Sequence, residues 1–186
     1  MLGEDAKEHL YALTEELSRG AEACALHGTP LGTLLFIMAS CELLSLYLVG
    51  SRRPAGPRGN RALYEFLSAY FPRFNEEARD ERGHLLRVRV PLGKTGGKAY
   101  KRMKIPYAMI HLYRRGALED LVAPPSAPKR CIVMGVGRWG FQIQVECLHH
   151  DFQVALEKYK VAVLTNPLLE QRYLRRFHHL HGWAAP

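Results

Sequence analysis

The sequence predicts a mainly α-helical protein, an up-and-down bundle of about five to six helices with one or two small β-hairpins. Apolar residues recur at spacings of three and four over several long stretches, as in helices that bury one face. Two shorter stretches alternate apolar with polar residues, which is typical of strands. Hydrophobic residues make up 47% of the 186 residues, so we expect one core and a single domain over residues 1–186.

Two long helices are predicted at the N-terminal end of the chain. The first covers residues 4–27. Gly28 and Pro30 separate it from a second helix over 30–49, because proline suits a first helical turn, and Gly50 suits the end of that helix. The apolar face of the first helix consists of Leu10, Leu13, Leu17, Ala21 and Cys24.

The stretch 30–49 contains a single charged residue, Glu42, and is long enough to span a bilayer. An acid near the middle of a span is costly, so we expect a buried bundle helix and no membrane partner. A carboxylate in a dry helix is normally paired or protonated. We therefore hypothesise that Arg114 or Arg115 pairs with Glu42; the alternative is that Glu42 reaches solvent at a bundle edge. The polar N-terminus does not resemble a signal peptide, and we expect a cytoplasmic location.

Two further helices are predicted on either side of a basic segment. Residues 51–60 have the composition of a loop, and a helix follows over 62–71, closed by Pro72. Another helix begins at about Pro106. Its single apolar face consists of Met109, Leu112, Tyr113, Gly116 and Ala117.

Residues 82–104 carry all of the excess positive charge. The chain has 26 Lys+Arg and 18 Asp+Glu, and this segment holds eight of the basic residues and no acidic one. Residues 85–90 alternate like a strand and 93–97 have turn composition, so we interpret the segment as a basic hairpin arm inserted between two bundle helices. The basic residues are Arg82, Arg87, Arg89, Lys94, Lys98, Lys101, Arg102 and Lys104.

A positive field this localised most often meets phosphate, so we expect the arm to bind RNA, DNA or another acidic partner. The predicted nucleic-acid-binding residues are Arg87, Arg89, Lys94, Lys98, Lys101 and Arg102.

Two glycine-containing motifs imitate nucleotide-binding loops. Gly93-Lys94-Thr95 resembles the end of a P-loop, but that motif needs a glycine where Val88 stands. Gly135-x-Gly137-x-x-Gly140 matches the dinucleotide fingerprint as a string, but a strand is predicted after it instead of a helix. We interpret both motifs as hairpin turns.

The C-terminal part of the chain predicts a second hairpin and two helices. The hairpin covers residues 130–148, and helices follow over 149–163 and 167–181, with Asn166 and Pro167 opening the last one. The apolar residues that alternate with polar ones in the second strand of the hairpin are Phe141, Ile143, Val145 and Cys147.

Cysteines and histidines give no clear metal site. The cysteines at 24, 41, 131 and 147 form no CxxC motif, which favours a reduced intracellular compartment. Five histidines lie near the C-terminal end, but their spacing does not force the four-ligand convergence of a structural zinc site. We expect no metal and no cofactor. The histidines are His149, His150, His178, His179 and His181.

Four stretches together resemble the HEPN-like helical bundle family, particularly its bacterial members of uncharacterised function. They are an apolar helix with an embedded acid (39–50), the helix after it (62–74), an arginine-bearing segment (109–120), and a strand followed by a helix (141–159). The resemblance implies a helical bundle that pairs as a homodimer through its motif-bearing helices. It also implies a relation to metal-independent ribonucleases that use an arginine, a polar neighbour and a histidine four to six residues later.

Carried over to this chain, the resemblance makes Arg114 the arginine and puts Arg115 in the place of its polar neighbour. The histidine position falls at about Glu119, and no histidine occurs over 115–121. A nuclease would lack its expected proton-transfer group there. Arg115 and Glu119 are instead spaced for a local helical ion pair. The candidate catalytic residues are Arg114, Glu119, Glu42 and His111, with His84 as a further histidine.

Three functions are therefore open. The first is a non-catalytic HEPN-like protein that binds nucleic acid or an acidic partner through the arm. The second is a metal-independent ribonuclease in which Arg114 works with a histidine from elsewhere, such as His111 or His84. The third is a protein-interaction module in which the arm is a solvated spacer.

Overall fold

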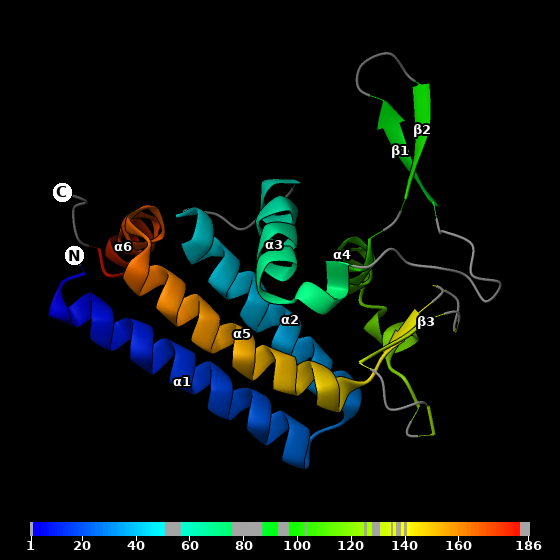
Figure 1. Ribbon diagram of the computed structural model, residues 1–186, viewed down its shortest axis with the longest axis horizontal. Helices are drawn as coiled ribbons and strands as arrows, with labels where there is room; N and C mark the ends of the chain where they lie inside the picture. Colours follow the sequence, from blue (N-terminus) through cyan, green and yellow to red (C-terminus); the bar gives the residue numbers. More distant parts are fainter. Residues whose placement is uncertain are drawn as a thin grey trace.

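A computed structural model describes residues 2–50, 57–75, 87–92, 97–102, 104–124, 126–127, 131–134, 136, 139 and 141–182. These residues form six α-helices and two antiparallel two-stranded hairpins, which confirms the predicted mainly helical bundle (Figure 1). In chain order the elements are α1 (Glu4–His27), α2 (Pro30–Val49), α3 (Pro57–Tyr70), η1 (Pro72–Asn75), β1 (Arg87–Leu92), β2 (Gly97–Arg102), α4 (Ile105–Arg115), η3 (Leu118–Leu121), β3 (Ile132–Met134), β4 (Phe141–Ile143), α5 (Val145–Thr165) and α6 (Pro167–Leu180).

Helices α1 and α2 have the predicted bounds. The Thr29 side chain accepts a hydrogen bond from the backbone nitrogen of Gly32, and Pro30 lies in the first turn of α2. Gly50 ends α2 with a φ of 62°, in the left-handed region that glycine adopts without strain.

Helix α2 lies at the centre of the bundle and contacts α1, α3, α5 and α6 (Figure 1). Among the described helices, it has the length and apolar composition that crossing a membrane would require. Its residues Leu34, Met38, Cys41 and Leu44 are fully buried against the other helices. The expectation of a bundle helix that is largely buried inside the protein is therefore confirmed, although Leu35 is exposed.

Helix α3 begins earlier than predicted. The prediction of a loop over 51–60 is wrong from Pro57 onward, because Pro57 opens the helix, and residues 51–56 lie outside the described ones. Proline and glycine over 57–59 have loop composition, yet proline is well tolerated in a first turn. This extra turn matters for the site, because it carries Asn60.

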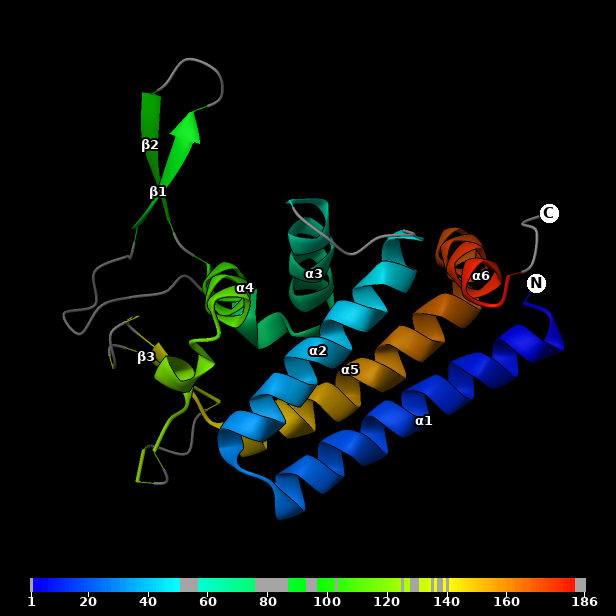
Figure 2. The same cartoon turned by 180° about the vertical axis from the view of Figure 1, so that it is seen from behind.

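Helix α4 confirms part of the predicted apolar face, because Gly116 and Ala117 lie beyond its last residue, Arg115. Met109 and Leu112 are buried, and Gly116 ends the helix with a φ of 65°. Helix α4 packs against α3, and the two helices form the side of the bundle nearest the β1–β2 hairpin (Figures 1 and 2).

The second hairpin is shorter than predicted. Only Phe141–Ile143 forms β4, and α5 already begins at Val145, so the prediction that Val145 and Cys147 belong to a strand is wrong. Residues 145–147 fit both periods, and the helical one prevails because Val145, Leu148 and Phe152 share the buried face of α5. Helix α6 follows as predicted, with the side chain of Asn166 capping its first turn.

Candidate functional site

The basic arm forms the predicted hairpin. The register of its two strands determines which residues lie on each face of the ribbon. Directly paired residues of an antiparallel ribbon share a face, and successive residues along a strand alternate between faces. Strands β1 and β2 pair Arg87 with Arg102, Arg89 with Tyr100, and Pro91 with Lys98. One face of the ribbon, which we call the basic face, therefore consists of Arg87, Arg89, Pro91, Lys98, Tyr100 and Arg102.

The opposite face of the ribbon has a different composition. Val88 is paired with Lys101, Val90 with Ala99, and Leu92 with Gly97. Of the six predicted binding residues, four thus share the basic face and Lys101 lies on the other face. Lys94 lies outside the described residues.

The hairpin stands away from the bundle and leads directly into α4 (Figures 1 and 2). Strand β2 ends at Arg102 and α4 begins at Ile105, with Lys104 at its N-cap. Tyr107 therefore lies in the first turn of the helix that the hairpin joins. This connection puts the base of the hairpin close in the chain to Tyr107 and to the start of α4.

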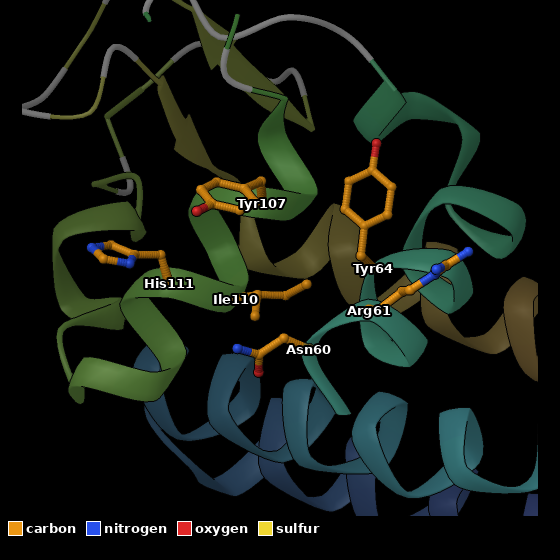
Figure 3. Close-up of a pocket in the computed structure, with 6 residues that line it drawn as sticks. All are labelled: Asn60, Arg61, Tyr64, Tyr107, Ile110 and His111. Atoms are coloured by element: carbon orange, nitrogen blue, oxygen red, sulfur yellow. The ribbon is translucent and has the colours of Figure 1, made fainter. Parts of the chain in front are cut away.

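A pocket of about 430 Å³ lies on the surface between α3 and α4, within the range of small-molecule sites. Figure 3 shows Tyr64 on α3 and Tyr107 on α4 on the two sides of the pocket, with Ile110 and Asn60 between the helices. The residues that line it are Asn60, Arg61, Tyr64, Tyr107, Ile110 and His111. Tyr107 is 46% exposed and Ile110 is buried, so the pocket combines an accessible aromatic ring with an apolar floor.

The pocket borders a polar network centred on Glu42. The Arg114 guanidinium donates from Nη2 to Glu42 Oε1 at 2.6 Å and from Nη1 to Oε2 at 3.0 Å. The Tyr113 hydroxyl donates to the same Oε2 at 3.1 Å, and Arg114 Nε donates to Asn60 Oδ1 at 3.0 Å. The hypothesis that Arg114 or Arg115 pairs with Glu42 is therefore confirmed for Arg114.

This network holds Arg114 in one orientation. A two-pronged guanidinium–carboxylate contact is among the strongest hydrogen-bonded pairs in proteins, and here it links α2 with α4. Burial, followed by the nearby Glu42 carboxylate, raises the pKa of Tyr113, which keeps its hydroxyl protonated as a donor. The arginine is thus occupied by structural partners at the edge of the pocket.

The second hairpin contributes a residue beside the pocket. The Trp139 and His111 rings meet edge to face with centroids 6.1 Å apart, and Trp139 Nε1 donates to Asp120 Oδ2 at 3.1 Å. His111 is half-buried and lies three residues before Arg114 on α4. Of the histidines proposed for a nuclease, His111 lies at the pocket, whereas His84 is outside the described residues.

Glu119 is not part of the Glu42 network. Helix α4 ends at Arg115, and Glu119 is exposed on the separate turn η3. The predicted helical ion pair between Arg115 and Glu119 is therefore wrong, because the two residues do not share a helix.

Histidines near the C-terminal end lie on two different helices. His149 and His150 are in α5, whereas His178 and His179 are in α6. Among the residues with a defined position, no group of three or more His, Cys, Asp or Glu could hold a metal ion.

Three residues that line the pocket were not predicted from the sequence. Asn60 lies in a stretch with loop composition, and Tyr64 and Tyr107 follow the ordinary pattern of amphipathic helices. One feature of the sequence could have identified Tyr107, which is its position shortly after the basic segment. An exposed aromatic residue there can add base stacking to a positively charged surface.

A disulfide between Cys131 and Cys147 was also not predicted. The cysteines are 16 residues apart, a separation that fits no short motif. Their Cα atoms are 5.0 Å apart, a normal separation for a disulfide.

Comparisons of the chain with protein-family models, with curated proteins and with solved structures found no match.

Proposed function

We propose that this protein binds single-stranded nucleic acid through the basic face of the β1–β2 hairpin, with a base stacked in the neighbouring pocket. The observation that carries the proposal is the register of the hairpin, which gathers Arg87, Arg89, Lys98 and Arg102 on one face. Arg87 and Arg89 are about 7 Å apart along β1, and Lys98 and Arg102 are about twice that distance apart along β2. The four cations are thus spread along both strands of the ribbon and can follow a phosphate backbone.

Aromatic residues favour a single strand over a duplex. Tyr100 shares the basic face, and Tyr64 and Tyr107 line the pocket beside the hairpin. Proteins that bind single strands combine a positive surface with rings on which unpaired bases stack. Bases inside a duplex are not available for such stacking.

We include membership of the HEPN-like family, without catalysis, in the proposal. It is supported by the order of an acid-bearing helix, α2, and an arginine-bearing helix, α4, joined here by Glu42 and Arg114. The homodimer and the cytoplasmic location that accompany this assignment are proposals as well. Sedimentation equilibrium would test the homodimer, for which we expect twice the chain mass.

A metal-independent ribonuclease is the second candidate, because His111 lies at the pocket close to Arg114. Its expected signature is cleavage of a bound RNA in the presence of a chelator, lost in Arg114→Ala. We favour binding alone because Glu42 and Asn60 already occupy the Arg114 guanidinium.

The proposed function can be tested by fluorescence anisotropy at low ionic strength with labelled strands of about 20 nucleotides, a length that covers one or more typical single-strand sites. We expect saturable binding of a single strand and weaker binding of the matched duplex. Polyglutamate serves as an acidic competitor without bases. No retention of RNA or DNA at low salt would reject the proposal, and equal binding of polyglutamate would indicate an acidic protein partner.

Replacing Tyr107 with alanine should weaken binding of the single strand at least fivefold, because stacking of one base contributes about 1–3 kcal/mol. Tyr107 is 46% exposed, so the fold should tolerate the change. Tyr11→Ala is the matched control, because Tyr11 is 49% exposed but lies on α1, away from the hairpin (Figure 1). Equal affinities of the two variants in the anisotropy titration would remove the pocket from the proposal.

A further inference from the structure

The disulfide between Cys131 and Cys147 lies beside a cation that contacts both sulfur atoms. Arg73 Nη1 is 2.6 Å from Cys131 Sγ and 3.4 Å from Cys147 Sγ. Arg73 belongs to η1, far from both cysteines in the sequence, so the fold brings this charge to the pair. A guanidinium stabilises a thiolate more than it stabilises a neutral disulfide.

Two further features distinguish the sulfur atoms from each other. Cys147 lies in the first turn of α5, where the positive end of the helix dipole also favours a thiolate. Cys147 is partly exposed, whereas Cys131, directly before β3, is buried. An attacking thiol from solution would therefore reach Cys147 first, and Cys131 would leave next to Arg73.

A negative charge opposes this stabilisation. Asp151 lies one helical turn after Cys147 on α5, and its Oδ2 is 3.7 Å from Arg73 Nε. Its carboxylate competes with the sulfur atoms for the guanidinium and repels a thiolate. Arg73 thus favours the reduced thiolates over the disulfide, whereas Asp151 favours the disulfide. Removing each charge in turn therefore tests the effect of charge on this equilibrium.

We propose that Cys131 and Cys147 form a redox-active pair that exchanges with low-molecular-weight thiols of the glutathione class. In the first step, an external thiolate attacks Cys147 Sγ, a mixed disulfide forms, and the bond to Cys131 breaks to leave a thiolate beside Arg73. In the second step, another external thiolate attacks the external sulfur of the mixed disulfide and releases Cys147 as a thiolate. Two external thiols are oxidised to one disulfide, and the protein disulfide is reduced by two electrons to two thiols.

Cys41 provides an internal contrast. It is completely buried, and burial raises the pKa of its thiol far above the ordinary value, so it stays protonated and unreactive. Cys41 is therefore not expected to exchange with external thiols, in contrast to the pair at Arg73.

The exchange acts on the part of the molecule next to the pocket. The disulfide ties the start of β3 to α5, and the turn between β3 and β4 carries Trp139, which packs against His111. Opening the disulfide removes this tie. With Trp183→Phe, Trp139 is the remaining tryptophan of the two in the chain, and its fluorescence should change on reduction.

The test equilibrates the folded protein in mixtures of reduced and oxidised glutathione, followed by an acid quench, alkylation and peptide mass mapping. We expect a reversible transition of the 131–147 pair within the range of ratios that glutathione buffers. In Arg73→Gln, half-reduction of the pair should need an about tenfold higher ratio of reduced glutathione squared to oxidised glutathione. The reason is that the variant loses the hydrogen bond from Arg73 to the thiolate. Asp151→Asn should shift the transition in the opposite direction.

Single cysteine variants test the order of attack. Cys131→Ser should accumulate a glutathione adduct at Cys147, whereas Cys147→Ser should gain little adduct at the buried Cys131. A pair that resists reduction until the protein unfolds would overturn the proposal, as would a pair that never closes in oxidised glutathione. Shifts in the same direction for Arg73→Gln and Asp151→Asn would overturn the role of charge, and if Arg73→Gln does not fold, Asp151→Asn and the adduct pattern still decide.

Discussion

Replacing Arg87, Arg89, Lys98 and Arg102 with glutamine should weaken binding of a single-stranded probe by about 100-fold or more at roughly 0.1 M salt. These residues share the basic face of the hairpin, and each neutralised phosphate releases a condensed counterion. The hairpin stands apart from the helices, so the bundle should remain folded (Figure 1). Anisotropy titrations measure the affinity, and circular dichroism checks the fold.

A charge-matched variant separates the hairpin from the overall positive charge of the protein. Lys7, Arg19, Lys158 and Arg175 are exposed on α1, α5 and α6, and replacing them with glutamine removes the same number of charges. We expect this variant to keep most of its affinity, because steering by net charge is weaker than direct phosphate contact. An equal loss in both variants would mean that the hairpin has no special role.

Glu42→Ala should lower the free energy of unfolding by about 2 kcal/mol, because it removes three charge-assisted hydrogen bonds. A fully buried pair would cost more, but the side chains of Glu42 and Arg114 are 19% and 36% exposed. Water can therefore partly solvate the stranded arginine. Urea denaturation measures the change.

An exposed ion pair of the same chain provides the control. Arg61 Nε donates to Glu65 Oε1 at 2.8 Å, with both residues on the surface of α3. Glu65→Ala should cost less than about 0.5 kcal/mol, as is usual for exposed helical pairs. A double-mutant cycle of Glu42→Ala and Arg114→Ala should give a coupling of about 1–2 kcal/mol. Independent effects of these two mutations would contradict the role of the pair between α2 and α4.

The helical fold could be predicted because local patterns and tertiary packing agree in most of the chain. Helices α1, α2 and α6 begin and end at residues with strong local preferences, such as Pro30, Gly50 and Asn166. The partner of Glu42 was also predictable, since an acid in an apolar helix requires a cation and few cations lie on other apolar helices.

The remaining features depend on tertiary structure. Val145 and Cys147 fit a strand by alternation, and only burial of one face of α5 selects the helix. The disulfide joins residues on separate elements, and Asn60 meets Arg114 across two helices. No local pattern encodes these contacts, because each one is set by how distant elements pack.

The β1–β2 hairpin could be predicted only in part. Its charge could be counted in the sequence, and its turn composition predicted the two strands. The division into faces follows from the pairing of Arg87 with Arg102, and a register shifted by one residue would split the cations between the two faces.

The salt dependence of binding tests the central claim most directly. Binding of a single strand by the unaltered protein should weaken with a slope of log affinity against log salt of about −3, as expected for four phosphate contacts. The variant with Arg87, Arg89, Lys98 and Arg102 replaced should lose most of this slope, whereas the charge-matched variant should keep it. A slope that is the same in all three proteins would contradict binding through the basic face of the hairpin.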